Sequence, residues 1–164
     1  MVTVRSYQEG DAQAVGRLIE KTYGEFNLSF LPVRERGPYL GPFKHSQSEE
    51  DAHKEAIART IQADIVFVAE EDGKIVGVLR GKKSRLQSLF VLAEYHGKGI
   101  GRQLVQRFED MCLKLDSKQI ALASSLFAVS FYQKMGYKKS TGVREGRSFQ
   151  GVGFRFQPMK KVLG

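Results

Sequence analysis

A glycine-rich segment is the part of the sequence with the clearest potential for chemistry. Glycine stands at every second position, as Gly97, Gly99 and Gly101, between an apolar run and a helical pattern. Glycine lets the backbone adopt positive φ and approach a ligand closely, and a helix N-terminus presents unpaired N–H groups with a partial positive charge. Lys98 and Arg102 add charge at the same place. The segment therefore predicts a phosphate site, with a glycine turn that binds nothing as the alternative.

Known phosphate motifs fit this segment only in part. The third glycine of a dinucleotide fingerprint would fall at Arg102, and the spacing does not fit a P-loop. The three histidines, His45, His53 and His96, show no metal-ligand spacing, so we expect no metal. Cys112 lies on the apolar face of a predicted helix and is interpreted as a core residue.

Alternating helical and strand patterns place the glycine segment within one α/β core. Residues 2–5 predict a strand, and Asp11 is expected to cap a helix whose buried stripe holds Val15, Leu18, Ile19, Thr22 and Phe26. Residues 27–47 hold three of the four prolines and are expected to form a long loop with apolar side chains. A polar helix is predicted from Ser48, its expected cap, to about Gln62.

The second half of the chain predicts strands around the glycine segment. Residues 64–70, 75–80 and 85–92 predict a three-strand meander, with a hairpin turn at Asp72-Gly73. A helix with a buried stripe should follow the glycines; its stripe holds Leu104, Phe108, Met111, Cys112 and Leu115. A strand at 118–123, a short helix at 125–137 and two strands within 137–162 complete the pattern.

Length, composition and charge limit the class of protein. A chain of 164 residues with 41% hydrophobic and 27% charged residues indicates a single soluble domain, residues 1–164. No apolar run reaches the length of a membrane span, no signal-peptide core is seen, and one cysteine suits a reducing cytoplasm. Residues 1–73 carry 8 basic and 13 acidic residues, whereas residues 74–164 carry 18 and 5. The basic half predicts an anionic partner: a coenzyme, nucleic acid or an acidic protein.

Two motifs in this half resemble those of one superfamily. The string VLAEYHGKGIGRQLV resembles the coenzyme signature of the GNAT superfamily of acyl-CoA-dependent N-acetyltransferases, Gln/Arg-x-x-Gly-x-Gly/Ala. Gly99 and Gly101 match its glycines, and His96 stands where Gln or Arg is usual. The string SLFAVSFYQKMGY, residues 125–137, resembles the downstream motif Asn-x-x-Ala-x-x-Phe-Tyr-x-x-x-Gly-Phe/Tyr, with Ser125 in place of Asn.

The resemblance implies a fold and a coenzyme. The fold would be α/β (α+β type): a GNAT-like central mixed, mostly antiparallel sheet of about six or seven strands flanked by about four helices. Acetyl-CoA would be the co-substrate, with its pantetheine arm between two splayed strands and its pyrophosphate on the N–H groups of 97–102. The implied coenzyme-binding residues are Leu89, Phe90, Val91, His96, Gly97, Lys98, Gly99, Ile100, Gly101, Arg102 and Ser125.

The resemblance also implies a reaction. The acceptor amine would attack the thioester directly, and Tyr132 would protonate the leaving thiolate. A place in the apolar core is the alternative for Tyr132, because Ala128, Phe131 and Met135 share its helical face. The general base is left open among Glu70, Glu94 and a water relay.

Acceptor and partners are less defined by the sequence. The acceptor would be recognised by residues 27–47, where Phe30, Tyr39 and Phe43 either line a pocket or fold the loop onto the core, and Arg34, Arg36 and Lys44 are candidates for a carboxylate. A small amine, an amino acid, a peptide N-terminus and a protein lysine are all open, as is a homodimer. The competing hypotheses are a non-catalytic CoA-binding regulator and a basic nucleic-acid-binding domain, for which the known aromatic and zinc motifs are absent.

Overall fold

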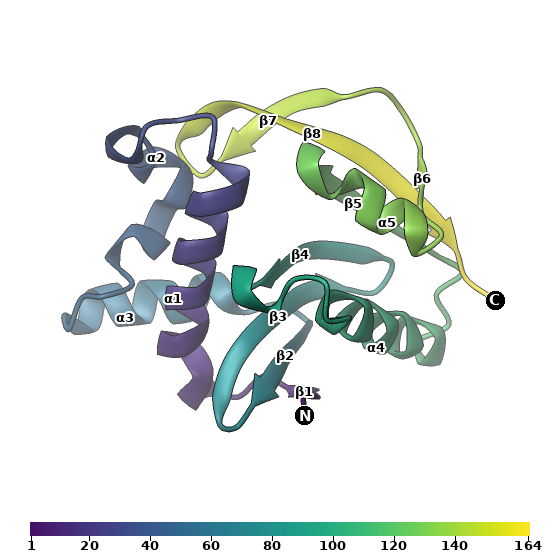
Figure 1. The fold of residues 1–164 in the computed structure, drawn as a ribbon, viewed down its shortest axis with the longest axis horizontal. Coiled ribbons are helices and arrows are strands. Elements are labelled where there is room, and N and C mark those ends of the chain that lie inside the picture. Colours follow the sequence, from purple (N-terminus) through teal and green to yellow (C-terminus); the bar gives the residue numbers. More distant parts are fainter.

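A single mixed sheet of eight strands organises the protein, and the computed structural model describes residues 1–164 (Figure 1). The strand order is β1-β2-β3-β4-β5-β8-β6, and β7 pairs with β8 outside this path. All pairs are antiparallel except β4–β5, which is parallel. The strands are β1 (Thr3–Ser6), β2 (Ile65–Glu71), β3 (Lys74–Lys82), β4 (Arg85–Val91), β5 (Gln119–Ser125), β6 (Lys138–Lys139), β7 (Arg144–Ser148) and β8 (Gly151–Val162).

Helices cover both faces of the first half of the sheet. The α-helices are α1 (Ala12–Thr22), α2 (Gly37–Leu40), α3 (Asp51–Ile61), α4 (Ile100–Lys114) and α5 (Val129–Lys134). A π-helical turn, Tyr23–Asn27, extends α1, and short 3₁₀ helices lie at Glu9–Asp11, Val33–Glu35, Gly41–His45, Ala93–Tyr95 and Leu126–Ala128. None of these helices combines the length and apolar character needed to cross a membrane. This architecture confirms the predicted GNAT-like class, with one strand and one helix more than the approximate expectation.

Side-chain alternation along β3 separates the two helical layers. The hydrogens of Gly77 and Gly81 face α4, because a Cβ at these positions would lie 3.1 Å from Leu104 and 2.6 Å from Phe108. Successive strand residues point to opposite faces, so Arg80 points away from α4. Arg80 indeed reaches the C-terminal end of α3 on the other face, where its Nε donates to the Ile61 carbonyl at 2.7 Å.

The predicted apolar stripes form the core, with small corrections at their ends. The first four residues of the α1 stripe are buried and Phe26 is half-buried. In α4, Leu104, Phe108 and Cys112 are fully buried. Leu115 is exposed because the helix ends at Lys114.

Residues 27–47 differ from the expected loop. They form short helical turns and α2, and this segment packs against the β7–β8 hairpin. The Tyr39 hydroxyl donates to the Val152 carbonyl at 2.6 Å, so Tyr39 folds the segment onto the protein. Ser48 is not the N-cap of α3; Glu50 is, and the Ser48 hydroxyl accepts the Glu50 N–H at 3.1 Å.

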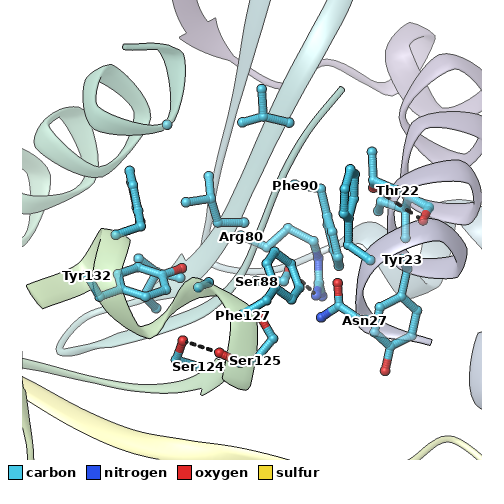
Figure 2. A pocket seen from close by; sticks show the side chains of 18 of the residues that line it. Thr22, Tyr23, Asn27, Arg80, Ser88, Phe90, Ser124, Ser125, Phe127 and Tyr132 are labelled. Atoms are coloured by element: carbon cyan, nitrogen blue, oxygen red, sulfur yellow. Dashed lines mark hydrogen bonds between the residues drawn. The ribbon is translucent and has the colours of Figure 1, made fainter. Parts of the chain in front are cut away.

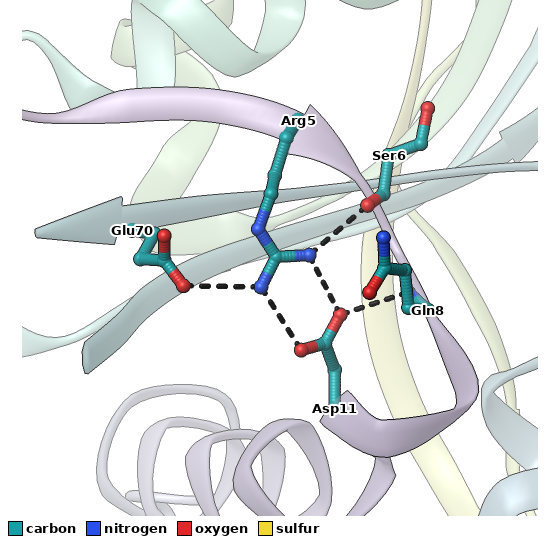
Figure 3. A network of polar contacts seen from close by, with 5 residues as sticks. All are labelled: Arg5, Ser6, Gln8, Asp11 and Glu70. Carbon is teal, nitrogen blue, oxygen red and sulfur yellow. Dashed lines mark hydrogen bonds and ion pairs between the residues drawn. The ribbon is translucent and has the colours of Figure 1, made fainter. Parts of the chain in front are cut away.

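An ion-pair network joins the start of the chain to the sheet (Figure 3). The Arg5 guanidinium donates to both carboxylate oxygens of Asp11, at 2.8 and 3.0 Å, and to Glu70 on β2 at 3.1 Å. The Asp11 carboxylate also accepts the Gln8 N–H at 2.8 Å, but it makes no capping bond to α1 itself. The network therefore fixes β1 and the entry to α1 against β2, where the sequence predicted only a helix cap.

We expect Asp11→Asn to lower the free energy of unfolding by about 1–2 kcal/mol at neutral pH, since the bidentate contact is partly buried. The hydrogen bond from Arg5 holds the pKa of Asp11 below its ordinary value. The stabilisation is therefore present above that ordinary value, about 3.9, and is lost as the pH falls through the lowered pKa.

Urea unfolding of both proteins from pH 7 down to pH 2 measures this. Glu9→Gln is the control, because Glu9 is an exposed carboxylate in the same turn. A difference between wild type and Asp11→Asn that stays constant over the whole pH range would contradict the assignment.

Candidate active site

The opening between β4 and β5 is the central feature of the site. The two strands pair only at Arg85–Ala121 and Leu86–Leu122, and beyond Leu86 they have no register in common. On its other side β4 stays paired with β3 through Val91. The C-terminal half of β4 therefore has one free backbone edge inside the sheet.

The backbone groups on this free edge can be assigned. The Leu92 N–H donates to the Val76 carbonyl at 3.0 Å, so Leu92 bonds toward β3. In an antiparallel pair these bonding residues alternate with residues whose N–H and C=O point the other way. Leu89 and Val91 therefore direct their backbone polar groups into the opening.

The glycine segment lies at the end of this edge, as predicted, and its glycines differ in role. Gly97 and Gly99 have φ of 78° and 80°, which favours glycine, and a Cβ on either would meet no atom within 4 Å. Gly99 is the N-cap of α4 and leaves open space in front of the helix N-terminus. Gly101 has ordinary φ, and a Cβ there would lie 3.1 Å from the Phe131 ring. It allows α4 to pack closely on α5.

The structure gives His96 a role within the loop. Its Nε2 lies 2.7 Å from the Val91 carbonyl oxygen, and its ring packs on Phe26 with a centroid distance of 5.0 Å. One ring nitrogen therefore bonds to the free edge of β4. His96 connects this edge to the turn that follows α1.

A cleft of about 770 Å³ occupies the opening (Figure 2). Tyr132 is 6% exposed, and its hydroxyl points into the cleft from α5 without a hydrogen bond to the chain. Its ring packs edge-on against Phe131 and Tyr137, at centroid distances of 5.1 and 5.7 Å. Tyr137 is held in turn by a hydrogen bond to the buried Glu109 at 2.8 Å. The Tyr132 hydroxyl is thus fixed in position and available to a ligand.

Burial sets the protonation state of this hydroxyl. Desolvation raises the pKa of Tyr132 well above the ordinary phenol value, and no carboxylate contributes to the shift. The phenol therefore stays protonated throughout the neutral and mildly alkaline range. In this range the hydroxyl is available as a hydrogen-bond and proton donor and does not act as a base.

The cleft brings together all but one of the predicted coenzyme-binding residues and Tyr132. Lys98 is outside it; its ammonium lies over the Tyr95 ring, 5.0 Å from the centroid. Ser125 lies on the β5 side, where its carbonyl accepts the Ser124 hydroxyl at 2.7 Å.

Both carboxylates considered as the general base lie elsewhere. Glu70 is paired with Arg5 in the β1–β2 network, and Glu94 is an exposed residue 4.0 Å from the Lys21 ammonium. The cleft wall contains no Asp or Glu at all, whereas four cations lie on it: Arg80, Arg102, Lys134 and Arg147. No carboxylate on the cleft wall is therefore placed to act directly as a base on a ligand bound there.

Residues 27–47, where the sequence predicted acceptor recognition, contribute little of the wall of this cleft. Of residues 27–47 only Asn27 and Phe43 line the cleft, and Phe30 is 57% exposed. The Arg36 Nε donates to the Leu31 carbonyl at 3.0 Å instead of facing the cleft. The aromatic wall comes mostly from separate elements, namely Tyr23, Phe90, Phe127, Phe149, Phe154 and Phe156. Apart from Phe90, which the family resemblance implied, nothing in the local sequence pattern marks these positions, because only the fold brings them together.

The fold and this cleft define a class of protein in which an opened parallel strand pair lies beside a glycine-rich helix N-terminus. The sequence model of the acetyltransferase (GNAT) domain matches residues 36–163. The chain belongs to this family. A comparison with curated proteins finds no match.

Solved structures share the fold over nearly the whole chain. A GCN5-related N-acetyltransferase from Rhodopseudomonas palustris is 20% identical, with a TM-score of 0.75 over 98% of this chain and 95% of that one. PaiA N-acetyltransferase from Thermoplasma acidophilum, solved with coenzyme A, is 17% identical, with a TM-score of 0.69 over 99% of both chains. YncA from Salmonella typhimurium, solved with its cofactor acetyl-CoA, is 18% identical, with a TM-score of 0.64 over 100% and 95%.

Proposed function

We propose that the protein transfers the acetyl group of acetyl-CoA to a primary amine within a ternary complex, with Tyr132 as the general acid. The observation that carries this is the free edge of β4, which leads from an open helix N-terminus to the buried Tyr132 hydroxyl. Membership of the acetyltransferase family supports it. A reducing cytoplasmic location agrees with the single cysteine, which is buried.

Several features of the cleft itself suit acetyl-CoA. The open space in front of Gly97 and Gly99 leaves the N–H groups at the start of α4 accessible to a pyrophosphate. Arg102 and Lys134 add positive charge to the wall. The N–H and C=O of Leu89 and the N–H of Val91 suit the amides of a pantetheine arm, whereas the Val91 carbonyl is bonded to His96. PaiA and YncA, which share the fold, were solved with coenzyme A and acetyl-CoA.

Acetyl-CoA supplies an activated acetyl thioester. The amine nitrogen forms a bond to the acetyl carbon and releases a proton to water, the carbon–sulfur bond breaks, and the sulfur receives a proton from the Tyr132 hydroxyl. Tyr132 then regains its proton from solvent. Backbone N–H groups on the free edge of β4 would donate to the thioester oxygen as negative charge develops on it. Both substrates bound in one cleft gain from proximity.

The positive charge of the cleft explains how the reaction can proceed without a carboxylate base. Nearby cations and a partly apolar wall disfavour an ammonium ion, so they lower the pKa of the acceptor amine. The amine is expected to lose its proton to water on binding. This arrangement needs no protein base beside the reacting nitrogen.

A thiol-release assay tests the proposed activity. The intact protein is incubated with acetyl-CoA and a panel of amines, and free CoA thiol is measured together with the acetylated amine. Stoichiometric formation of both supports the enzyme. Tight CoA binding without either product over the whole panel would favour the non-catalytic regulator.

Gly99→Ala tests the coenzyme placement. A Cβ at Gly99 projects into the open space where the pyrophosphate must approach, so we expect CoA affinity to fall roughly tenfold or more, the effect of losing a charge-assisted hydrogen bond. Calorimetry measures it. Gly73→Ala is a matched control, since Gly73 has the same φ of 80°, equally open surroundings and a place in the β2–β3 turn. Equal CoA affinity in the two variants would contradict the placement.

Tyr132→Phe tests the general acid. The ring and its packing are kept and only the hydroxyl is lost, so the single-turnover rate should fall by about 10²–10⁴-fold with little change in acetyl-CoA affinity. Tyr7→Phe, outside the cleft, is the control. A wild-type single-turnover rate in Tyr132→Phe would make Tyr132 a packing residue.

The pH dependence follows from the raised pKa of Tyr132. A general acid works in its protonated form, and a raised pKa keeps that form present above the ordinary phenol value of about 10. The wild-type single-turnover rate should therefore rise with pH as the acceptor amine loses its proton and should not fall again below about pH 10. A descending limb near pH 8 that is absent from Tyr132→Phe would show that Tyr132 ionises there.

A further inference from the structure

Arg80 is a cation on the acceptor side of the cleft without an acidic partner. It lies on β3 directly opposite Ser88 of β4 and points to the face of the sheet away from α4 and the glycine segment. In Figure 2 it lies with Ser88 on the side of the cleft nearer Asn27, and Tyr132 enters from the other side. It forms no salt bridge, and every hydrogen bond it makes within the chain goes to a neutral oxygen.

The hydrogen bonds of Arg80 leave one nitrogen available. Its Nε donates to the Ile61 carbonyl at 2.7 Å, and one terminal nitrogen donates to the carbonyls of Thr60 at 2.8 Å and Gln62 at 3.3 Å. The other terminal nitrogen has a single long contact, 3.4 Å, to the Ser88 hydroxyl. A guanidinium has five N–H donors, so this second nitrogen keeps donor capacity toward the cleft.

The three carbonyls hold the guanidinium in place but do not neutralise it. They belong to the C-terminal end of α3, where the helix dipole supplies a partial negative charge, smaller than a full carboxylate. Burial lowers the pKa of Arg80, which reflects the cost of keeping its charge there. A fixed, partly desolvated guanidinium with a free donor is preorganised to bind an anion.

The geometry points to an acceptor that carries a carboxylate beside its primary amine, with the carboxylate bound by Arg80 and an apolar body against the aromatic wall. This inference rests on the proposed acetyl transfer and adds the substrate class to it. Tyr23 packs against both Phe90 and Phe154 on this side, with centroid distances of 5.7 and 6.0 Å. An amino acid with an aromatic side chain has all three features. A polyamine does not suit the cleft, because its several positive charges would need carboxylates and no carboxylate lines the cleft.

A comparison of three acceptors tests this on the unmodified protein. L-Phenylalanine, phenylalaninamide and phenethylamine share one body and one amine but differ in the carboxylate. We expect kcat/KM for phenylalanine to exceed that for the other two by about 10- to 150-fold, the range of a hydrogen bond to a charged group. The amine of phenylalaninamide is less basic than that of phenylalanine, so more of it is present as the reactive free base. This difference favours the amide and cannot produce the expected preference for phenylalanine. Equal or faster turnover of the amide or of phenethylamine would overturn the inference.

Arg80→Gln links the preference to this side chain. The ratio of kcat/KM for phenylalanine over that for its amide should fall to within about threefold in Arg80→Gln. Arg59→Gln is the matched control, because Arg59 is an exposed arginine near the same end of α3 and lies outside the cleft. A preserved preference in folded Arg80→Gln would reduce Arg80 to a helix cap. If Arg80→Gln fails to fold, the acceptor comparison on the wild type decides alone.

A binding measurement separates this inference from the proposed activity. N-acetylphenylalanine and its amide are titrated calorimetrically into the protein with CoA present. One outcome is that N-acetylphenylalanine binds about tenfold or more tightly than its amide while none of the amines is turned over. That result would contradict the proposed acetyl transfer but support the carboxylate site. Turnover of amines together with equal or absent binding of the two products would overturn the carboxylate site and leave the transfer intact.

Discussion

The early end of pairing between β4 and β5 is the constraint on which the rest of the structure depends. Backbone polar groups inside a protein are almost always paired, and an unpaired edge in the middle of a sheet is therefore unusual. Here β5 is held on its other side by seven paired positions with β8, and β4 is held by β3. Each strand is fixed by its other neighbour, so the opening persists although β4 and β5 pair only at Arg85 and Leu86. The groups left free on β4 then define where an extended polar ligand fits.

The same opening connects two chemically different faces. Alternation along β3 directs Gly77 and Gly81 to α4 and Arg80 to α3. The glycine segment and the N-terminus of α4 belong to the first face, and the aromatic wall near Tyr23 belongs to the second. Tyr132 approaches from α5 at the boundary. A coenzyme and an acceptor that enter from opposite faces can thus meet inside the sheet, where neither helical layer blocks the other.

Local signals predicted the glycine side of the cleft, and they could not predict the side that holds Arg80 and the aromatic wall. The meander, the glycines and the helix after them are contiguous in sequence, so local patterns are enough to predict how they follow one another. Arg80 looks like any strand arginine until the end of α3 supplies the carbonyls of Thr60 and Ile61. Arg36 seemed better placed, but its guanidinium bonds to Leu31 within its own segment. The different roles of Gly99 and Gly101 also depend on Phe131, which is distant in sequence but lies beside Gly101.

The charge of the cleft connects substrate choice to proton chemistry. Lysine and arginine on its wall raise the energy of an ammonium ion, so an amine without further attraction would bind weakly in its common protonated form. A carboxylate on the same molecule reverses this balance, because its attraction to Arg80 offsets the repulsion of the nitrogen. In the proposed reaction, the binding energy of the remote carboxylate would bring the amine into the cleft as a free base. A wall without carboxylates therefore suits an amino-acid-like acceptor better than a simple amine, and it makes a separate protein base unnecessary.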